Sequence, residues 1–160
     1  MDYTIRRIEE KDNAKMAQII RAIFHELDAP KEGTAYADPI LDCLSDVYIG
    51  ANEIYYVVEV AGEVLGGSGI APLAGNDANI CELQKMYFAP ELRGKGIAQV
   101  LIEKCLSFAK EAGFDQCYLE TLPFMTAAQK LYKKVGFQYT DAPLGCTGHG
   151  SCDVFMIKEL

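Results

Sequence analysis

A strand that runs into a glycine-containing turn and then a helix constrains the fold of this chain more than any other feature. Residues 81–88 have the pattern of a strand, and residues 97–112 place apolar side chains on one face of a helix. Between them lies Arg93-Gly94-Lys95-Gly96-Ile97-Ala98. The two glycines allow a tight turn and leave amide N–H groups uncovered, next to the positive end of the helix. The segment therefore predicts an anion site, with Arg93 and Lys95 at its rim.

Two familiar phosphate-binding motifs do not match this turn. A nucleoside triphosphatase loop requires Lys and then Ser or Thr after its last glycine, whereas Gly96 is followed by Ile97-Ala98. A dinucleotide fingerprint requires a third glycine at the position that Gln99 holds. The turn matches Arg/Gln-x-x-Gly-x-Gly/Ala instead, with Arg93, Gly96 and Ala98 at the three specified positions.

Hydrophobic periodicity divides the rest of the chain into strands and helices. Strands are predicted at 3–8, 54–60, 64–73, 79–88, 115–122, 137–140 and 152–158, and helices at 12–27, 39–47, 97–112 and 126–135. Thr126 and Gln129 have the spacing of a capping box. Gly66, Gly67 and Gly69 indicate a bulge or a close backbone approach in their strand. The strand–helix–strand unit within a mixed sheet indicates an α/β (α+β) domain.

Size and composition exclude several classes of protein. The 160 residues, half of them apolar, predict one domain over 1–160 with a proper core. The net charge of −8 argues against nucleic acid as a partner, and no apolar run approaches the roughly 20 residues that cross a bilayer. The six cysteines lack paired spacing and residues 1–7 lack a signal-peptide pattern, so we expect reduced thiols and a cytoplasmic protein.

Four segments carry a family resemblance. They are residues 81–90, the turn 93–98, residues 118–122, and residues 128–137, which have the form Ala-x-x-x-Tyr-x-x-x-Gly-Phe. In their order and intervals they resemble the GNAT (GCN5-related N-acetyltransferase) superfamily, most closely a widespread bacterial group for which the resemblance settles no substrate. The resemblance implies a GNAT fold: a mixed, mostly antiparallel twisted sheet of about seven strands, a central splayed parallel pair, and helices on both faces.

The resemblance also implies acetyl-CoA as the cosubstrate. In this family the pantetheine arm lies between two splayed parallel strands, which here correspond to 81–88 and 115–122. Backbone groups around Met86, Tyr87 and Phe88 would pair with the pantetheine amides. The pyrophosphate would bind at the turn, which comprises Arg93, Gly94, Lys95, Gly96, Ile97 and Ala98.

Acetyl transfer to an amine requires an acid for the departing thiolate, and Tyr132 is the candidate. It occupies the family's acid position, and the ordinary tyrosine pKa of about 10 is close to that of an alkyl thiol. A structural role would instead leave its ring packed and its hydroxyl hydrated. Many family members have Asn seven residues earlier as a cofactor contact, where this chain has Met125. The departure puts this side-chain contact with the cofactor in doubt, but it does not affect the pyrophosphate site.

The reaction also requires a base for the ammonium proton, and Glu82 is the candidate. It lies eleven residues before Arg93, on the strand where some family members carry a catalytic Glu that often acts through water. Strand alternation places Glu82 and Gln84 on one face and Leu83 and Lys85 on the other, unless a bulge intervenes. Alternatively, Glu82 is a partly exposed strand residue or binds the substrate's ammonium group.

Two further residues are candidates for substrate contact. Glu120, on the neighbouring strand, would orient the amine, replace Glu82 as the base, or make a structural hydrogen bond. His149, in the loop before the last strand, would line the acceptor pocket or remain solvated. Cys146, His149 and Cys152 have metal-ligand spacing, but structural zinc normally takes four ligands, so no metal is expected. By the same resemblance, the N-terminal helices would form the acceptor side of the pocket, and their acidity suggests an amine-bearing substrate; the residues concerned are Glu26, Asp28, Tyr36, Asp38 and Asp42.

The leading hypothesis is an acetyl-CoA-dependent N-acetyltransferase that acts on a primary amine by direct attack in a ternary complex. A non-catalytic acyl-CoA-binding or sensing module is the alternative, and a metal-binding regulatory module built on the Cys/His loop is a third. No cysteine is required as a nucleophile. The family's exposed strand ends are a common route to dimers, so the resemblance also implies a homodimer.

Overall fold

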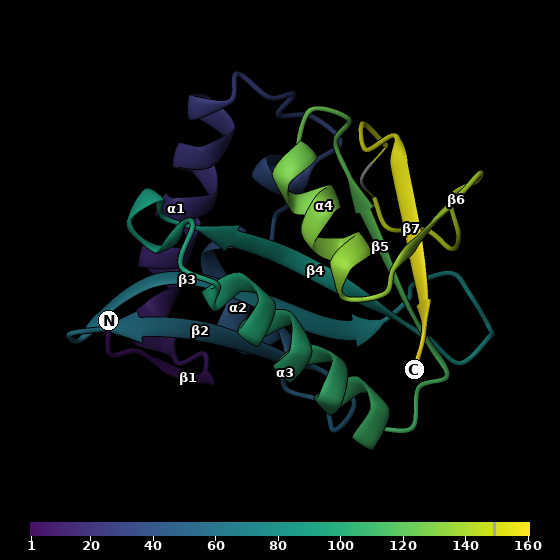
Figure 1. Ribbon diagram of the computed structural model, residues 1–160, viewed down its shortest axis with the longest axis horizontal. Coiled ribbons are helices and arrows are strands. Elements are labelled where there is room, and N and C mark those ends of the chain that lie inside the picture. The colour runs from purple at the N-terminus through teal and green to yellow at the C-terminus, as the bar shows by residue number, and fades with distance from the viewer. Residues whose placement is uncertain (149) are drawn as a thin grey trace.

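The computed structural model describes residues 1–148 and 150–160, which build a seven-stranded sheet (Figure 1). The strands follow the order β1-β2-β3-β4-β5-β7-β6, and every neighbouring pair is antiparallel except β4 and β5. Their bounds are β1 Thr4–Arg7, β2 Ile54–Val60, β3 Glu63–Pro72, β4 Ile80–Phe88, β5 Gln116–Thr121, β6 Gln138–Thr140 and β7 Val154–Glu159. The predicted mixed sheet with a central parallel pair is confirmed.

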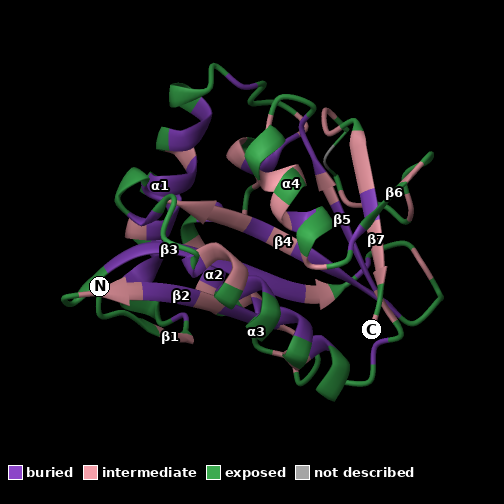
Figure 2. Cartoon of the chain, viewed as in Figure 1, coloured by how far each residue is buried: buried purple, intermediate pink, exposed green. Residues whose placement is uncertain are grey.

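Helices cover both faces of this sheet, as predicted. They are α1 Asn13–Glu26, α2 Leu44–Val47, α3 Ile97–Glu111 and α4 Thr126–Lys134. Figure 1 shows α3 and α4 on the near face and α1 passing behind the sheet. Each face has its own apolar core, one built with α3 and α4 and the other with α1 and α2. Figure 2 shows buried residues along the central strands and exposed residues on the outer sides of α3 and α4. Within the described ranges, no helix combines the length and apolar character needed to cross a bilayer.

Two local predictions are wrong. The helix expected at 39–47 is a 3-10 turn, Leu41–Cys43, followed by the single-turn α2, because Cys43 leaves helical geometry with φ −138°. The capping box expected at Thr126 does not form, since Thr126 is already inside α4 and its N-cap is Met125. The Gln129 amide instead donates to the carbonyl oxygens of Leu122 and Pro123, which fixes the turn that precedes the helix.

The bulge indicated by the glycine-rich strand is present, and it reshapes β4. Gly67 pairs with Tyr87 and Gly69 with Gln84, so one residue of β3 faces two residues of β4. Lys85 occupies the bulge in the left-handed region, with φ 50°. The Tyr55 hydroxyl donates to the Lys85 carbonyl oxygen at 2.7 Å. A Cβ atom on Gly67 or Gly69 would come within 2.6 or 2.7 Å of the Tyr55 ring, which explains both glycines.

The parallel pair at the centre of the sheet is short. β4 and β5 pair only at Ile80–Gln116, Cys81–Cys117 and Glu82–Tyr118. Beyond Glu82 the paired register ends, although both strands continue to Phe88 and Thr121. The second half of β4 therefore borders a gap in the sheet, and the bulge begins near the point where that gap opens.

Candidate active site

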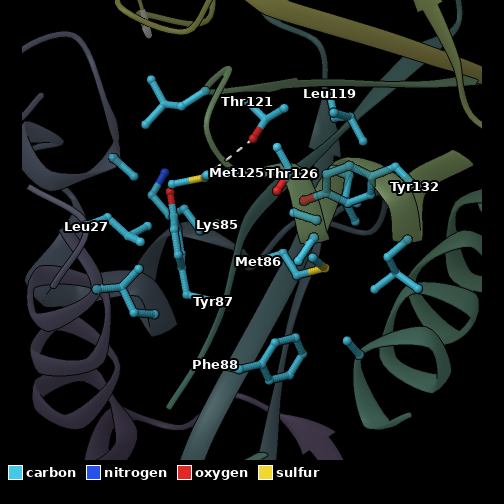
Figure 3. Close-up of a pocket in the computed structure, with 18 of the residues that line it drawn as sticks. Leu27, Lys85, Met86, Tyr87, Phe88, Leu119, Thr121, Met125, Thr126 and Tyr132 are labelled. Carbon is cyan, nitrogen blue, oxygen red and sulfur yellow. Dashed lines mark hydrogen bonds between the residues drawn. The ribbon is translucent and has the colours of Figure 1, made fainter. Parts of the chain in front are cut away.

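A cavity of about 480 Å³ occupies the gap between β4 and β5. Its wall includes the glycine turn before α3, the start of α4 and the end of α1. Figure 3 shows Tyr132 on one side of the cavity, Tyr87 and Leu27 on the opposite side, and Met86 and Phe88 along β4. The predicted site residues that line it are Glu82, Met86, Tyr87, Phe88, Arg93, Gly94, Gly96, Ala98, Glu120 and Tyr132. The structure thus gathers residues from four separate segments around one space.

The glycine turn has the geometry of an anion site. Gly94 and Gly96 lie in the left-handed region, with φ 72° and 75°, where residues with a Cβ atom are strained. Gly96 is the N-cap of α3, and no side chain caps this helix end. The first amides of α3 therefore have no cap from a side chain and are available to an anion, as are those of other glycine-rich helix starts.

The side chains of two residues in the turn point away from the cavity. Ile97 is buried in the core below α3, and Lys95 points outward, where its Nζ atom lies 4.0 Å from the Met1 sulfur. Neither side chain lines the cavity.

The positive charge of Arg93 is paired with a carboxylate at the end of helix α1. The Arg93 guanidinium donates to both carboxylate oxygens of Glu26, at 2.7 and 3.0 Å. This hydrogen bonding lowers the pKa of Glu26, so Glu26 stays ionised and offsets the charge of Arg93. The positive potential at the turn therefore comes mainly from the backbone amides and the helix end.

Glu82 lies on the inner wall, and its side chain is held by its neighbour on the same strand. The residue is only 4% exposed, and its Oε1 atom accepts a hydrogen bond from Gln84 Nε2 at 2.6 Å. The prediction that Glu82 and Gln84 share a face is thus confirmed, and Leu83 packs into the opposite core. Lys85 departs from the alternation because it occupies the bulge.

Lys85 instead forms a buried ion pair on the α1 side of the sheet. Its Nζ atom lies 2.7 Å from Asp38 Oδ2, and the two side chains are 3% and 17% exposed. Asp42 pairs with Arg21 at 2.8 Å, but at an exposed position. The acidic residues of the N-terminal segments, Glu26, Asp38 and Asp42, are therefore paired with basic residues of this chain. None of these three residues lines the cavity, so the expected acceptor side is not built from their carboxylates.

Glu120, the rival carboxylate, is engaged through both of its oxygen atoms. The Tyr118 hydroxyl donates to Oε2 at 2.6 Å, and the Thr147 hydroxyl donates to Oε1 at 2.5 Å. Burial first, and then the Glu120 hydrogen bond, raise the pKa of Tyr118, so the phenol remains protonated. These contacts tie the loop before β7 to strand β5, which gives Glu120 a structural task.

Tyr132 projects from α4 toward the cavity (Figure 3). It is 6% exposed, and its ring lies edge-on to Phe137 with centroids 5.9 Å apart. Burial raises the pKa of Tyr132 above its usual range. The phenol is therefore protonated at neutral pH, although the raised pKa moves it away from the match with an alkyl thiol that the sequence suggested. Nearby, Met125 lines the cavity, and its sulfur accepts a hydrogen bond from Thr121 at 3.5 Å.

Cysteine chemistry has little support in the cavity. All six cysteines are free, and Cys152 is the one that lines the cavity wall within the described residues. Burial raises the pKa of Cys152 to about 12, so its thiol is neutral and a weak nucleophile at pH 7. In the part of the chain that the structure describes, no three His, Cys, Asp or Glu residues are arranged to hold a metal ion. The prediction for His149 lies outside the described residues.

Comparison with known proteins identifies the family. The model of the acetyltransferase (GNAT) family matches residues 15–137. The chain belongs to this family. A relative from Escherichia coli K12, described as the uncharacterized N-acetyltransferase YjgM, is 49% identical over 158 residues, which cover 98% of this chain and 94% of the relative. The protein is therefore an acetyltransferase of the GNAT superfamily.

Solved structures show the same fold. A GNAT acetyltransferase from Staphylococcus aureus Mu50 superimposes with a TM-score of 0.88 at 21% identity, over 99% of each chain. YncA from Salmonella typhimurium, solved with its cofactor acetyl-CoA, gives a TM-score of 0.77 at 19% identity, over 100% of this chain and 95% of the other. At these identities the likeness concerns the architecture of the GNAT fold.

Three contacts at the GNAT site were not anticipated from the sequence. Tyr48, Asp38 and Glu26 reach Gln84, Lys85 and Arg93, respectively, from segments that are distant in the chain. No local pattern marks such pairs. The pairing of Lys85 with Asp38 also depends on the bulge, and the glycines that indicated it lie on the neighbouring strand.

Proposed function

We propose that this GNAT protein transfers the acetyl group of acetyl-CoA to a primary amine by direct attack in a ternary complex. The observation that carries the proposal is the single cavity wall that contains the glycine turn, the open side of β4, Tyr132 and Glu82. Acetyl-CoA in YncA and coenzyme A in a Thermoplasma acidophilum PaiA N-acetyltransferase support the choice of cosubstrate.

The cosubstrate would enter from the α3 end of the cavity. Its pyrophosphate would accept hydrogen bonds from the amides of residues 94–98, where the helix dipole also favours an anion. The pantetheine arm would then follow the open side of β4 near Met86 and Phe88, since β5 no longer pairs with this part of the strand. This path brings the thioester between Tyr132 and Glu82.

The chemistry divides between two side chains. The Glu82 carboxylate takes a proton from the substrate ammonium, directly or through water, and the amine lone pair then attacks the thioester carbonyl carbon. As the tetrahedral intermediate collapses, the C–S bond breaks, the Tyr132 hydroxyl gives its proton to the sulfur, and the nitrogen releases its second proton to water. The products are the acetylated amine and coenzyme A, and Glu82 returns its proton to Tyr132 through solvent. The high pKa of Tyr132 favours this reprotonation.

Cofactor binding is the first step to test. Thermal unfolding would be followed with acetyl-CoA, with desulfo-CoA and dephospho-CoA as controls. A ligand that binds only the folded state adds about 2.7 kcal/mol of stability at one hundred times its dissociation constant. We expect a clear rise in Tm with acetyl-CoA, and no rise at millimolar concentration would contradict the proposal.

Turnover would then be measured as free-thiol release on a panel of primary amines that includes alkylamines, diamines, amino acids and peptides with a free lysine. Amine-dependent release of coenzyme A is the expected result. Tight acetyl-CoA binding without release on any amine would instead favour an acyl-CoA-binding module.

A further inference from the structure

We infer that Gln84 and Tyr48 are positioning residues that hold the Glu82 carboxylate in place. The inference rests on the proposed function, since it concerns the side chain assigned as the base. It starts from a chain of two short hydrogen bonds. The Tyr48 hydroxyl donates to Gln84 Oε1 at 2.6 Å, and Gln84 Nε2 donates to Glu82 Oε1 at 2.6 Å. Tyr48 and Glu82 are only 2% and 4% exposed.

The chemistry of the three groups fixes the direction of this chain. An ionised carboxylate only accepts hydrogen bonds, so the Gln84 amide must turn its NH₂ group toward Glu82. Its carbonyl oxygen then faces Tyr48, which must donate. Burial raises the pKa of Tyr48 above its usual range, so the phenol keeps the proton that it donates. An amide flip would place two acceptors against each other at Glu82, so the carboxylate itself selects this orientation.

The backbone around Gln84 is fixed as firmly as its side chain. The Ser68 hydroxyl donates to the Gln84 carbonyl oxygen at 3.3 Å, and the Tyr55 hydroxyl donates to that of Lys85, the bulge residue. The Tyr48 ring packs on the Tyr55 ring with centroids 5.3 Å apart. Gln84 is therefore held on the Glu82 face at the last position before the bulge.

A donor at Glu82 has a defined effect on its ionisation. Burial favours the neutral acid, whereas a hydrogen bond to the carboxylate favours the charged form that accepts a proton. Tyr48, Cys117, Tyr118 and Cys152 also interact electrostatically with Glu82, and burial raises the pKa of each, so they are uncharged near pH 7. Lys85 lies in the bulge and Asp38 beside it, and their opposite charges offset each other. Glu120, another carboxylate, lies on the adjacent strand β5.

The test follows the ionisation of Glu82 directly. The carboxyl carbon of ¹³C-labelled Glu82, assigned by its loss in Glu82→Gln, is titrated by NMR in the full chain. Gln84→Leu removes the donor and should raise the pKa of Glu82 by at least about 0.5. Gln84→Glu places a second carboxylate beside the first and should raise it further. Tyr48→Phe keeps the ring packing and should raise it by less. Tyr56→Phe, a hydroxyl deletion on β2 outside the cavity, is the matched control.

Kinetics then test whether this positioning serves the reaction. In Gln84→Leu, the acidic limb of the kcat profile should move to higher pH and kcat should fall at least about fivefold, with KM for acetyl-CoA changed less than about twofold. A Glu82 titration identical to wild type in both Gln84→Leu and Tyr48→Phe would overturn the inference. If Gln84→Leu does not fold, Tyr48→Phe decides alone. The NMR titration of Glu82 needs no substrate. If the wild-type protein were inactive on every amine, the proposed function would be overturned, but the titration would still test the positioning of Glu82.

Discussion

At the scale of single residues, the proposed acid and base lie in complementary settings. Burial keeps the Tyr132 phenol protonated, whereas the Gln84 amide stabilises the charged form of Glu82. Each setting favours the protonation state that the proposed role requires. The neutral Cys152 thiol on the same wall has no comparable activation.

Removal of one hydroxyl should separate chemistry from binding. Tyr132→Phe should lower kcat at least about tenfold because the departing thiolate loses its proton donor, while the ring still fills its place beside Phe137. Steady-state kinetics should show little change in KM for acetyl-CoA. Tyr3→Phe, at an exposed tyrosine near the N-terminus, is the control. An unchanged kcat in Tyr132→Phe would eliminate the residue as the acid.

A second residue-scale prediction concerns Asp12, which anchors β1 to the start of α1. Burial alone would raise its pKa, but hydrogen bonds from Arg6 and from the Glu9 amide outweigh burial and lower it. Arg6 donates to both Asp12 oxygens, at 2.7 and 2.9 Å. The stabilisation is therefore complete above the unfolded pKa of about 3.9 and is lost as pH falls through the lower folded value.

Urea unfolding should show this dependence. Asp12→Asn should cost about 1–3 kcal/mol of unfolding free energy at pH 7, and the difference from wild type should shrink below about pH 4. Asp42→Asn removes a second two-bonded Arg–Asp pair, but an exposed one, and should have a much smaller effect. A pH-independent loss in Asp12→Asn would show that the charge of Asp12 is not the cause.

At the scale of elements, the start of α3 is the part of the site that depends least on side chains. Gly96→Asp places a carboxylate where the proposed pyrophosphate lies, so calorimetry should show acetyl-CoA binding weakened at least about tenfold. Gly113→Asp is a matched control at the other end of α3, because Gly113 also has a positive φ, 93°, and open space around its Cα atom. Equal affinity in the two variants would mean that the turn does not bind the cofactor.

The sequence predicts those features that depend on neighbouring residues, and it misses those that depend on contacts between distant segments. The order of strands and helices, the α3 turn and the shared face of Glu82 and Gln84 follow from periodicity and glycine positions, and the structure confirms them. The helix expected at 39–47 was wrong because Cys43 interrupts the helical geometry. The contacts of Tyr48 with Gln84 and of Asp38 with Lys85 join residues 36 and 47 positions apart, so they require the folded sheet.

At the scale of the whole molecule, the gap between β4 and β5 divides an otherwise continuous sheet. The β2–β3 hairpin and the β5–β7 pair are hydrogen-bonded along most of their lengths, whereas β4 loses β5 after Glu82. The proposed cosubstrate would fill this gap and connect the two halves of the sheet through its own amides. Its binding should therefore order the centre of the molecule more than the edges.

Hydrogen exchange with and without acetyl-CoA would show this pattern. Amides of residues 86–88 and 94–98 should exchange at least about tenfold more slowly in the complex, because they gain hydrogen-bond partners or lose access to water. Amides within the β2–β3 hairpin already have backbone partners and serve as the internal reference. Slower exchange at 94–98 alone would keep the pyrophosphate site but contradict a pantetheine arm along β4. Equally slower exchange of all amides would indicate global stabilisation without a defined site. Local contacts with the cofactor should slow residues 86–88 and 94–98 more than the hairpin.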